Sequence, residues 1–243
     1  MAHHTETLIN AFAFIGFRNA ADGDYIAART TFRRQLFPQF FWLAQQAVEK
    51  YLKCLLLLHR QNIPQIHDLQ RLLALADQVF DQPLRRSEQT DRVIAEINVG
   101  PMIRYGELSW DIDRDIRPEV DRCVWEIRRY CQAVKHVQDG AVEDRTTEVL
   151  TSVQSSDDAP RSKFRLTGGL LESVLDNKSS EARKDLVWRN ACFGSRQVRE
   201  GIYPDRYFQI VNTPAFVWPE LLAAVKPYGV YRNFDSPVTS TTE

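Results

Sequence analysis

Between residues 20 and 137 the sequence repeats one pattern: apolar residues recur every three or four positions in segments of helical length. This is the period of an amphipathic α-helix, and the alternation typical of strands is almost absent. The segments are separated by breaks at Pro38, Pro64, Gly100 and Pro118, residues that interrupt helices. We therefore predict an all-α fold, an up-and-down bundle of about five helices that occupies residues 1–138.

The expected helix starts follow from capping residues. Asp24 is predicted to cap a first helix, and Pro38 lies where a first-turn proline belongs in a longer helix that ends near Arg60. His67 and Asp68 are expected to open a third helix, and Ser87 a fourth. After Pro118 one core-facing stripe predicts a fifth helix, formed by Val120, Val124, Ile127, Tyr130 and Val134.

The composition changes after this bundle. Residues 138–160 hold six acidic residues against one basic residue, with Ser, Thr and Pro throughout, which predicts a flexible, mostly unstructured acidic linker at 139–160. Residues 161–206 hold ten basic against six acidic residues. We predict that residues 161–243 form a smaller basic and aromatic appendage of undetermined fold.

The charge balance and the cysteines exclude several classes of protein. A formal net charge of −1 gives no overall attraction to nucleic acid or anionic lipid. The four cysteines lack metal-ligand spacing, which indicates free thiols in a reducing, cytoplasmic protein. The longest apolar run, CLLLL at 54–58, is far shorter than the roughly 20 residues of a membrane span. We expect no membrane segment, no metal and no cofactor.

One helical segment carries an unexpected polar stripe. On a helical wheel the stripe covers one arc, opposite an apolar one, and it contains Trp42, Gln46, Glu49, Lys50, Lys53 and Arg60. Two interpretations are open. The stripe is either the solvated face of a bundle helix, with Glu49 and Lys53 as an ordinary i,i+4 pair, or part of a binding site.

Several short motifs resemble a known family in order and spacing. They are DYIAAR at 24–29, AQQAVEKYLK at 44–53, IHDL at 66–69 and IRY at 103–105. Together they are similar to the HEPN domain, over residues 20–137. The resemblance implies a helical bundle that usually dimerises. Such proteins bind nucleotides or RNA, act as partners of minimal nucleotidyltransferases, or serve as metal-independent ribonucleases in toxin and phage-defence systems.

Ribonuclease members of the family carry an arginine and then a histidine, with four to six residues between them. Arg60 and His67 have six residues between them, and the resemblance implies that this pair, which lies at the IHDL motif, is catalytic. A histidine can transfer protons near neutral pH, and a guanidinium can hold a phosphate. The motif departs from the catalytic form at Gln61 and at Pro64. The alternative is that His67 is a structural cap or strut.

The same hypothesis assigns substrate binding to the polar stripe and to the later motif, namely to Gln46, Glu49, Lys50, Lys53, Arg104 and Tyr105. For the last two, the alternative is an arginine paired with Glu107 and a tyrosine in the core. In the carboxy-terminal segment, rings and arginines alternate over residues 188–207 and could hold single-stranded RNA. The core and solvated side of a small appendage would produce the same pattern.

Two functions remain open from the sequence. The first is an RNA- or nucleotide-binding protein, extending to a metal-independent endoribonuclease effector of a toxin–antitoxin or phage-defence system. The second is a non-catalytic helical interaction module, such as the partner of a nucleotidyltransferase. We also predict a homodimer, because the helix from 38 to 60 has apolar residues over half of its circumference. An antitoxin would be a further partner.

Overall fold

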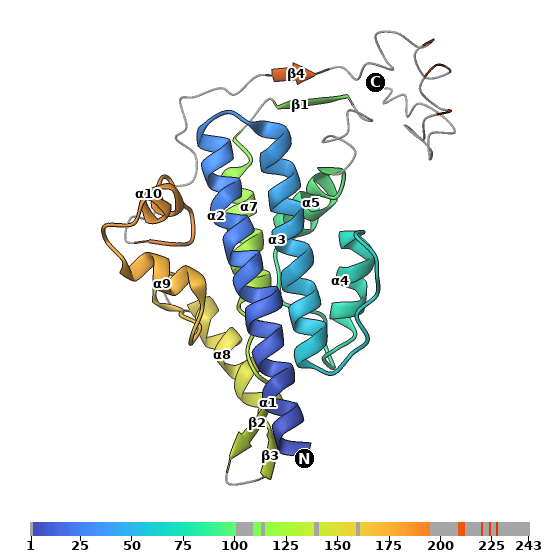
Figure 1. The fold of residues 1–243 in the computed structure, drawn as a ribbon, viewed down its shortest axis with the longest axis vertical. Helices are drawn as coiled ribbons and strands as arrows, with labels where there is room; N and C mark the ends of the chain where they lie inside the picture. Colours follow the sequence, from blue (N-terminus) through green and yellow to red (C-terminus); the bar gives the residue numbers. More distant parts are fainter. Residues whose placement is uncertain are drawn as a thin grey trace.

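The computed structural model describes residues 2–100, 109–112, 115–138, 141–158, 161–194 and 209–211, with the single positions 220, 224 and 227. The described part is predominantly helical, as the sequence predicts (Figure 1). Its strands form two small antiparallel pairs: β1 (Trp110–Ile112) with β4 (Gln209–Val211), and β2 (Lys135–Gln138) with β3 (Ala141–Asp144). None of the described helices combines the length and the apolar character needed to cross a membrane.

One long helical rod begins the chain. It consists of α1 (Ala2–Phe12), the π-helical η1 (Ala13–Asn19) and α2 (Ala20–Arg33), and the backbone stays helical at both junctions. The prediction that Asp24 caps a helix is therefore wrong. No Pro interrupts the residues before it, so the helix already exists there, and the Asp24 carboxylate instead pairs with Lys50 of the next helix.

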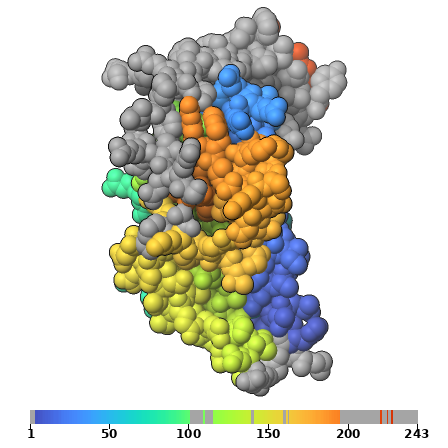
Figure 2. Space-filling model, turned by 90° about the vertical axis from the view of Figure 1, so that its left-hand side faces the viewer, coloured from blue at the N-terminus to red at the C-terminus, as the bar shows by residue number. Residues whose placement is uncertain are grey.

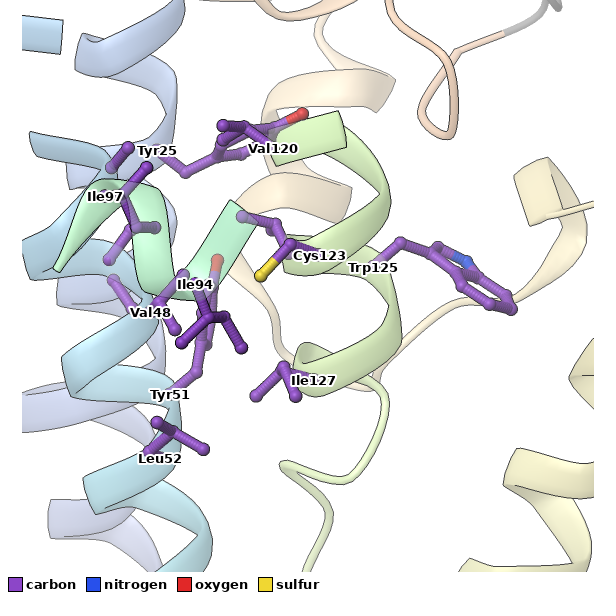
Figure 3. Close-up of a cluster of buried hydrophobic side chains, with 14 of the residues drawn as sticks. Tyr25, Val48, Tyr51, Leu52, Ile94, Ile97, Val120, Cys123, Trp125 and Ile127 are labelled. Atoms are coloured by element: carbon purple, nitrogen blue, oxygen red, sulfur yellow. The ribbon is translucent and has the colours of Figure 1, made fainter. Parts of the chain in front are cut away.

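The next helix, α3 (Phe37–Leu58), lies at the centre of the bundle. Pro38 occupies its first turn, as predicted. The surrounding helices are α2, α4 (Leu69–Asp77), α5 (Glu88–Ile97) and α7 (Arg117–Arg128). Figure 3 shows side chains of α2, α3, α5 and α7 meeting in one apolar cluster, with Val48 of α3 beside Ile94 and Ile97 of α5. The predicted stripe of the last helix is buried as expected, although α7 ends at Arg128.

α3 differs in one respect from the prediction. Gln39 is its only exposed residue, because neighbouring parts of the same chain cover most of the helix. The apolar circumference that suggested a dimer is thus satisfied within the monomer. The homodimer itself stays a prediction, but this reason for it is removed.

The acidic segment 139–160 is not mostly unstructured. The hairpin of β2 and β3 enters it, and α8 (Thr146–Asp158) fills most of it. Asp144 accepts a hydrogen bond from the backbone N–H of Thr146 at the start of the helix. Val149 and Val153 are buried at i,i+4 spacing. Composition misled the prediction because these few apolar residues occupy helical positions, where two of them suffice to dock the segment.

After α8 come η2 (Arg161–Lys163), α9 (Leu170–Asp176) and α10 (Glu181–Val187), of which α9 and α10 pack on α2. Leu171, Leu186 and Phe193 belong to the same apolar core as the bundle. In Figure 2, α9 and α10 (orange) and α8 (yellow) form one continuous surface beside the amino-terminal helix (blue). The segment is therefore joined to the bundle by a shared core.

Candidate functional site

A ladder of polar side chains runs along one face of α3. Gln45, Glu49 and Lys53 follow one another at i,i+4 spacing, and all are buried beneath the segment that leads into α4. Gln45 donates a hydrogen bond of 2.8 Å to the backbone carbonyl of His67. Polar groups at these positions face the protein interior, so the interpretation as a solvated face is wrong for Glu49 and Lys53.

The Glu49 carboxylate is the centre of this cluster. It accepts hydrogen bonds from Lys53 Nζ at 2.8 Å and from Gln45 Nε2 at 3.1 Å. Both of its oxygens also lie 3.1 Å from Nδ1 of His67. Burying a carboxylate is unfavourable unless it is paired and hydrogen-bonded, and these neighbours supply both conditions.

His67 combines a fixed orientation with access to solvent. Its side chain is 73% exposed, whereas that of Glu49 is only 5% exposed. Nδ1 faces the carboxylate, and Nε2 has no hydrogen-bond partner among the described residues. A carboxylate that accepts from Nδ1–H fixes the tautomer in which Nε2 is free to accept a proton. The arrangement can therefore serve proton transfer.

Asp68, not His67, caps α4. Its carboxylate accepts hydrogen bonds from the backbone N–H groups of Gln70 and Arg71. Asn98 fixes the same turn, since its side chain bonds both Asp68 and the backbone of Leu69. The prediction that His67 is a cap is wrong, and these bonds hold the backbone beside the histidine.

Arg60 lies elsewhere. It follows the end of α3, about three turns after Glu49, and the chain then returns along α3 to reach His67 at the start of α4 (Figure 1). The Arg60 guanidinium bonds Glu6 and Asn10 of α1, at 2.9 and 3.0 Å, and the last carbonyls of α3. The two residues of the predicted catalytic pair therefore have different partners: Arg60 is held by α1, and His67 by Glu49 of α3.

The backbone of Arg60 is also constrained. Its φ of 61° is left-handed, and the amides of Arg60 and Gln61 bond to the carbonyls of Leu57 and Leu56. This is the Schellman termination of a helix, at a position where glycine is usual. Arg60 thus combines a helix-ending conformation with an ion pair that joins α3 to α1.

The remaining predicted binding residues divide into two groups. Gln46 donates to Gln45 at 2.7 Å and belongs to the edge of the Glu49 cluster. Lys50 pairs with Asp24 of α2 and reaches the cluster only through Gln46, at 3.4 Å. Arg104 and Tyr105 lie outside the described residues. Gln45 was missed by the sequence analysis, although its place four residues before Glu49 would have identified it.

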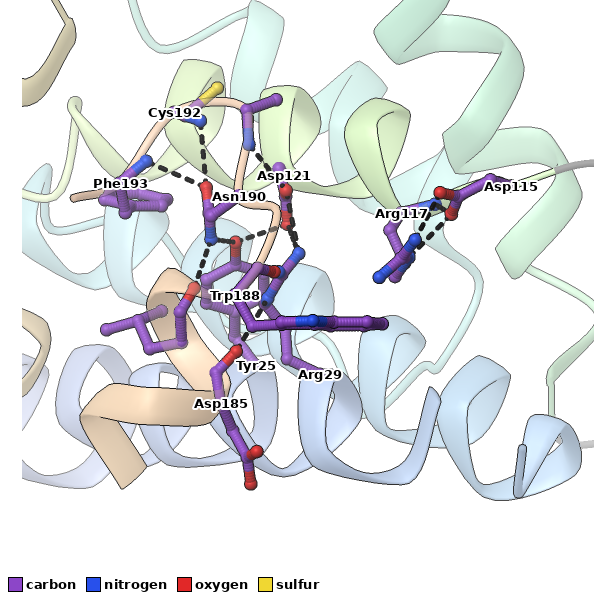
Figure 4. Close-up of polar contacts among 12 residues, drawn as sticks. Tyr25, Arg29, Asp115, Arg117, Asp121, Asp185, Trp188, Asn190, Cys192 and Phe193 are labelled. Atoms are coloured by element: carbon purple, nitrogen blue, oxygen red, sulfur yellow. Dashed lines mark hydrogen bonds and ion pairs between the residues drawn. The ribbon is translucent and has the colours of Figure 1, made fainter. Parts of the chain in front are cut away.

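A second polar network lies deeper and has a structural role (Figure 4). Arg29 donates to both oxygens of Asp121, at 2.6 and 2.8 Å, and Tyr25 donates to the same carboxylate. Burial raises the pKa of Tyr25 well above its usual value, and the Asp121 charge adds to the effect. Asn190 donates to the Tyr25 hydroxyl. All four side chains are buried, so the network joins α2, α7 and the carboxy-terminal segment and offers no ligand access.

The aromatic and basic carboxy-terminal residues are in part accounted for by packing. Phe193 is buried against Tyr25, and the Trp188 ring lies beneath the guanidinium of Arg33. This favours the core interpretation over an RNA platform for residues 188–193. The alternating residues from 196 to 207 lie outside the described part. Within that part, no group of three His, Cys, Asp or Glu side chains is placed to hold a metal ion.

Comparison with known proteins identifies a domain within the chain. The family model described as HEPN domain matches residues 17–106. The chain contains a HEPN domain. The match spans the rod from Phe17, all of α3, α4 and α5, and the Glu49–His67 cluster. No curated protein and no solved structure matches the chain.

A HEPN domain implies a function related to nucleotides or RNA, and domains of this family commonly dimerise. The match stops before α7, which packs on α3 and α5 in the same apolar core. The resemblance inferred from short motifs is therefore confirmed.

Proposed function

We propose that this HEPN protein binds RNA at the surface around His67 and cleaves it without a metal ion, with His67 as the proton-transferring residue. One observation carries the proposal: an exposed imidazole is held at Nδ1 by the buried carboxylate of Glu49, and its Nε2 is open to solvent. A positioned histidine of this kind is the commonest general acid or base.

The chemistry requires only proton transfer and phosphate binding. Nε2 of His67 would remove the proton from a ribose 2′-hydroxyl, whose oxygen then attacks the adjacent phosphorus. The P–O5′ bond breaks, the leaving 5′-oxygen takes a proton from water, and His67 afterwards returns its proton to the solvent. The 2′,3′-cyclic phosphate and a 5′-hydroxyl are the products. Glu49 would orient the ring and stabilise its protonated form, as a buried carboxylate does beside a catalytic histidine.

A cation must also hold the phosphate. Arg60 was the predicted candidate, but this role would require its guanidinium to leave Glu6 and Asn10. Arg71 is exposed in the first turn of α4, four residues after His67. The proposal assigns phosphate binding to Arg71 and a structural role to Arg60.

The cellular role that we propose is that of an endoribonuclease effector in a toxin–antitoxin or phage-defence system, with an antitoxin as partner. Its support is the HEPN match alone. The competing function is a non-catalytic nucleotide- or RNA-binding module, such as the partner of a nucleotidyltransferase. The two differ in whether the protein breaks RNA.

The test is incubation of the purified protein with a single-stranded RNA of mixed sequence in excess chelator. We would compare wild type with His67→Ala, Glu49→Gln, Arg71→Ala and Arg60→Gly, and monitor folding by circular dichroism. His4→Ala is the matched control, because His4 is an exposed histidine on α1. Products would be examined for cyclic phosphate ends.

We expect His67→Ala to lower the cleavage rate by about 10²–10⁴-fold. His4→Ala and a folded Arg60→Gly should retain the wild-type rate. If the protein binds RNA without cleaving it, and Arg71→Ala weakens the binding, the function is that of the non-catalytic binding module. If the protein neither cleaves nor binds RNA, and His67→Ala lowers the melting temperature, then His67 is a structural residue.

A further inference from the structure

The exposed large apolar side chains of the described residues are concentrated on the amino-terminal rod. Leu8 is 54% exposed, Phe12 60% and Ile15 71%. Spacings of four and three residues place them on one face of a helix. These residues define the α1–η1 face, which is the largest group of its kind, since Leu36, Val142 and Leu150 are exposed on separate elements.

The α1–η1 face also lacks charge. Between Thr5 and Phe17 the sequence holds one charged residue, Glu6, which pairs with Arg60. Arg18, the next charged residue, is buried and donates to the carbonyls of Cys131 and Thr167. The exposed positions from Thr5 to Gly16 are therefore polar without charge or apolar: Thr5, Thr7, Leu8, Phe12, Ile15 and Gly16.

We propose that the α1–η1 face is the homodimer interface, formed by two antiparallel copies of this helix. The apolar positions are symmetric about the point between Ala11 and Phe12. A two-fold axis at this point sets Leu8 opposite the partner's Ile15 and Ala11 opposite the partner's Phe12. Thr7 then faces the partner's Gly16, so each large side chain meets an apolar or a small one. A self-complementary face of this kind is what an isologous contact requires.

The charge distribution selects a second copy over other occupants. An amphipathic helix that lies on anionic lipid carries Lys or Arg along its polar border, and no exposed Lys or Arg occurs between Thr5 and Phe17. A charged protein partner would find no charge among the exposed side chains of the α1–η1 face itself. A second copy of the same uncharged face meets no electrostatic penalty.

The expected dimer is weak. The face from Thr5 to Gly16 is about 18 Å long at 1.5 Å per residue, and a single helix pair covers less than the ~800 Å² per partner of a standard interface. We expect dissociation on dilution through the micromolar range. This proposal is independent of RNA cleavage, because its readout is mass.

The experiment is analytical ultracentrifugation of the full chain over a concentration series, with an expected dimer mass of twice 28.2 kDa. The variants are Leu8→Glu, Ile15→Lys and the double variant of both. In the antiparallel arrangement, each single variant places a charge against an apolar side chain. The double variant places Glu opposite Lys at both ends of the contact. Leu36→Glu is the matched control, since Leu36 is 49% exposed and lies outside the α1–η1 face.

We expect each single variant to raise the dimer dissociation constant by about tenfold or more, and the double variant to recover a large part of the loss. Leu36→Glu should behave as wild type. A monomer at all concentrations, or a dimer insensitive to both single variants, would overturn the proposal. The proposal would also be overturned if the double variant were as monomeric as the single variants. Binding of the wild-type monomer to phosphatidylserine vesicles would overturn it as well.

Discussion

The buried carboxylate of Glu49 lies 3.1 Å from Nδ1 of His67, whose side chain is largely exposed, and 2.8 Å from Nζ of the buried Lys53. One carboxylate thus neutralises an interior ammonium and orients a surface imidazole. The two contacts have separable consequences: the first concerns stability, and the second concerns the proposed chemistry.

Breaking the Glu49–Lys53 pair should destabilise the protein strongly. Glu49→Gln leaves the Lys53 ammonium buried without its counter-charge. Lys53→Met leaves the Glu49 carboxylate buried without the ammonium that neutralises it. Each is expected to cost about 3–5 kcal/mol in the free energy of unfolding. The double variant should cost clearly less than the sum, which chemical denaturation of all four proteins would measure. Additive losses would show that the pair does not interact.

Arg60→Ala should destabilise more than Arg60→Gly. Both variants lose the bonds to Glu6 and Asn10, but only alanine keeps a side chain in the left-handed conformation of the helix end. Glycine relieves that strain, so we expect the free energy of unfolding of Arg60→Gly to exceed that of Arg60→Ala by about 1 kcal/mol. Thermal melts would compare the two. Equal stabilities would mean that the backbone conformation carries no cost.

His59 should make stability depend on pH. Burial lowers its pKa to about 4, with the nearby Arg60 and Lys135 charges contributing and Asp144 opposing, and its ring lies against Phe80. The folded state resists protonation, so the unfolded state binds more protons between pH ~6.5 and ~4. Stability is therefore present above pH ~6.5 and falls towards pH ~4, by up to about 3 kcal/mol.

Urea unfolding from pH 4 to 7.5 would measure this slope. His59→Phe keeps an aromatic ring at the position and removes the titrating group, so its slope should be smaller. A profile of the variant that matches wild type would assign the pH dependence to other groups.

Two glycine substitutions should have opposite effects. A Cβ at Gly100 would lie 2.9 Å from the Phe41 carbonyl oxygen, so Gly100→Ala must displace backbone and should lower the melting temperature. A Cβ at Gly23, within α2, would meet only Leu170 at 4.0 Å. Gly23→Ala should stabilise by about 0.5–1 kcal/mol through helix propensity. Stabilisation by both would contradict the close approach at Gly100.

The carboxy-terminal segment should be required for a stable bundle. Arg128 is buried between Asp22 and Glu172, with bonds of 2.6 to 2.8 Å to both carboxylates. A chain that ends at residue 160 loses Glu172 and the apolar cover of Leu171. We expect it to melt at a lower temperature and to bind a hydrophobic dye. A truncated chain as stable as the full one would support the predicted division into independent parts.

Several features could be predicted from the sequence because they depend on local spacing. The helical period, Pro38 in the first turn of α3, the cap at Ser87 and the order of the HEPN motifs are all properties of neighbouring residues. The structure and the family match confirm them. The prediction that the acidic segment is unstructured was wrong because composition ignores the positions of residues. Val149 and Val153 dock the segment because they lie on one face of a helix.

The site needed the tertiary structure. Periodicity placed Glu49 and Lys53 on a polar face of α3, but only the returning chain shows that His67 and α4 cover that face and convert a surface pair into a buried one. Sequence separation likewise paired Arg60 with His67, whereas Arg60 bonds Glu6, more than fifty residues earlier. Local sequence determines which side of a helix is polar. The free energy of desolvation, set by whichever distant segment covers that side, decides what the polar residues do.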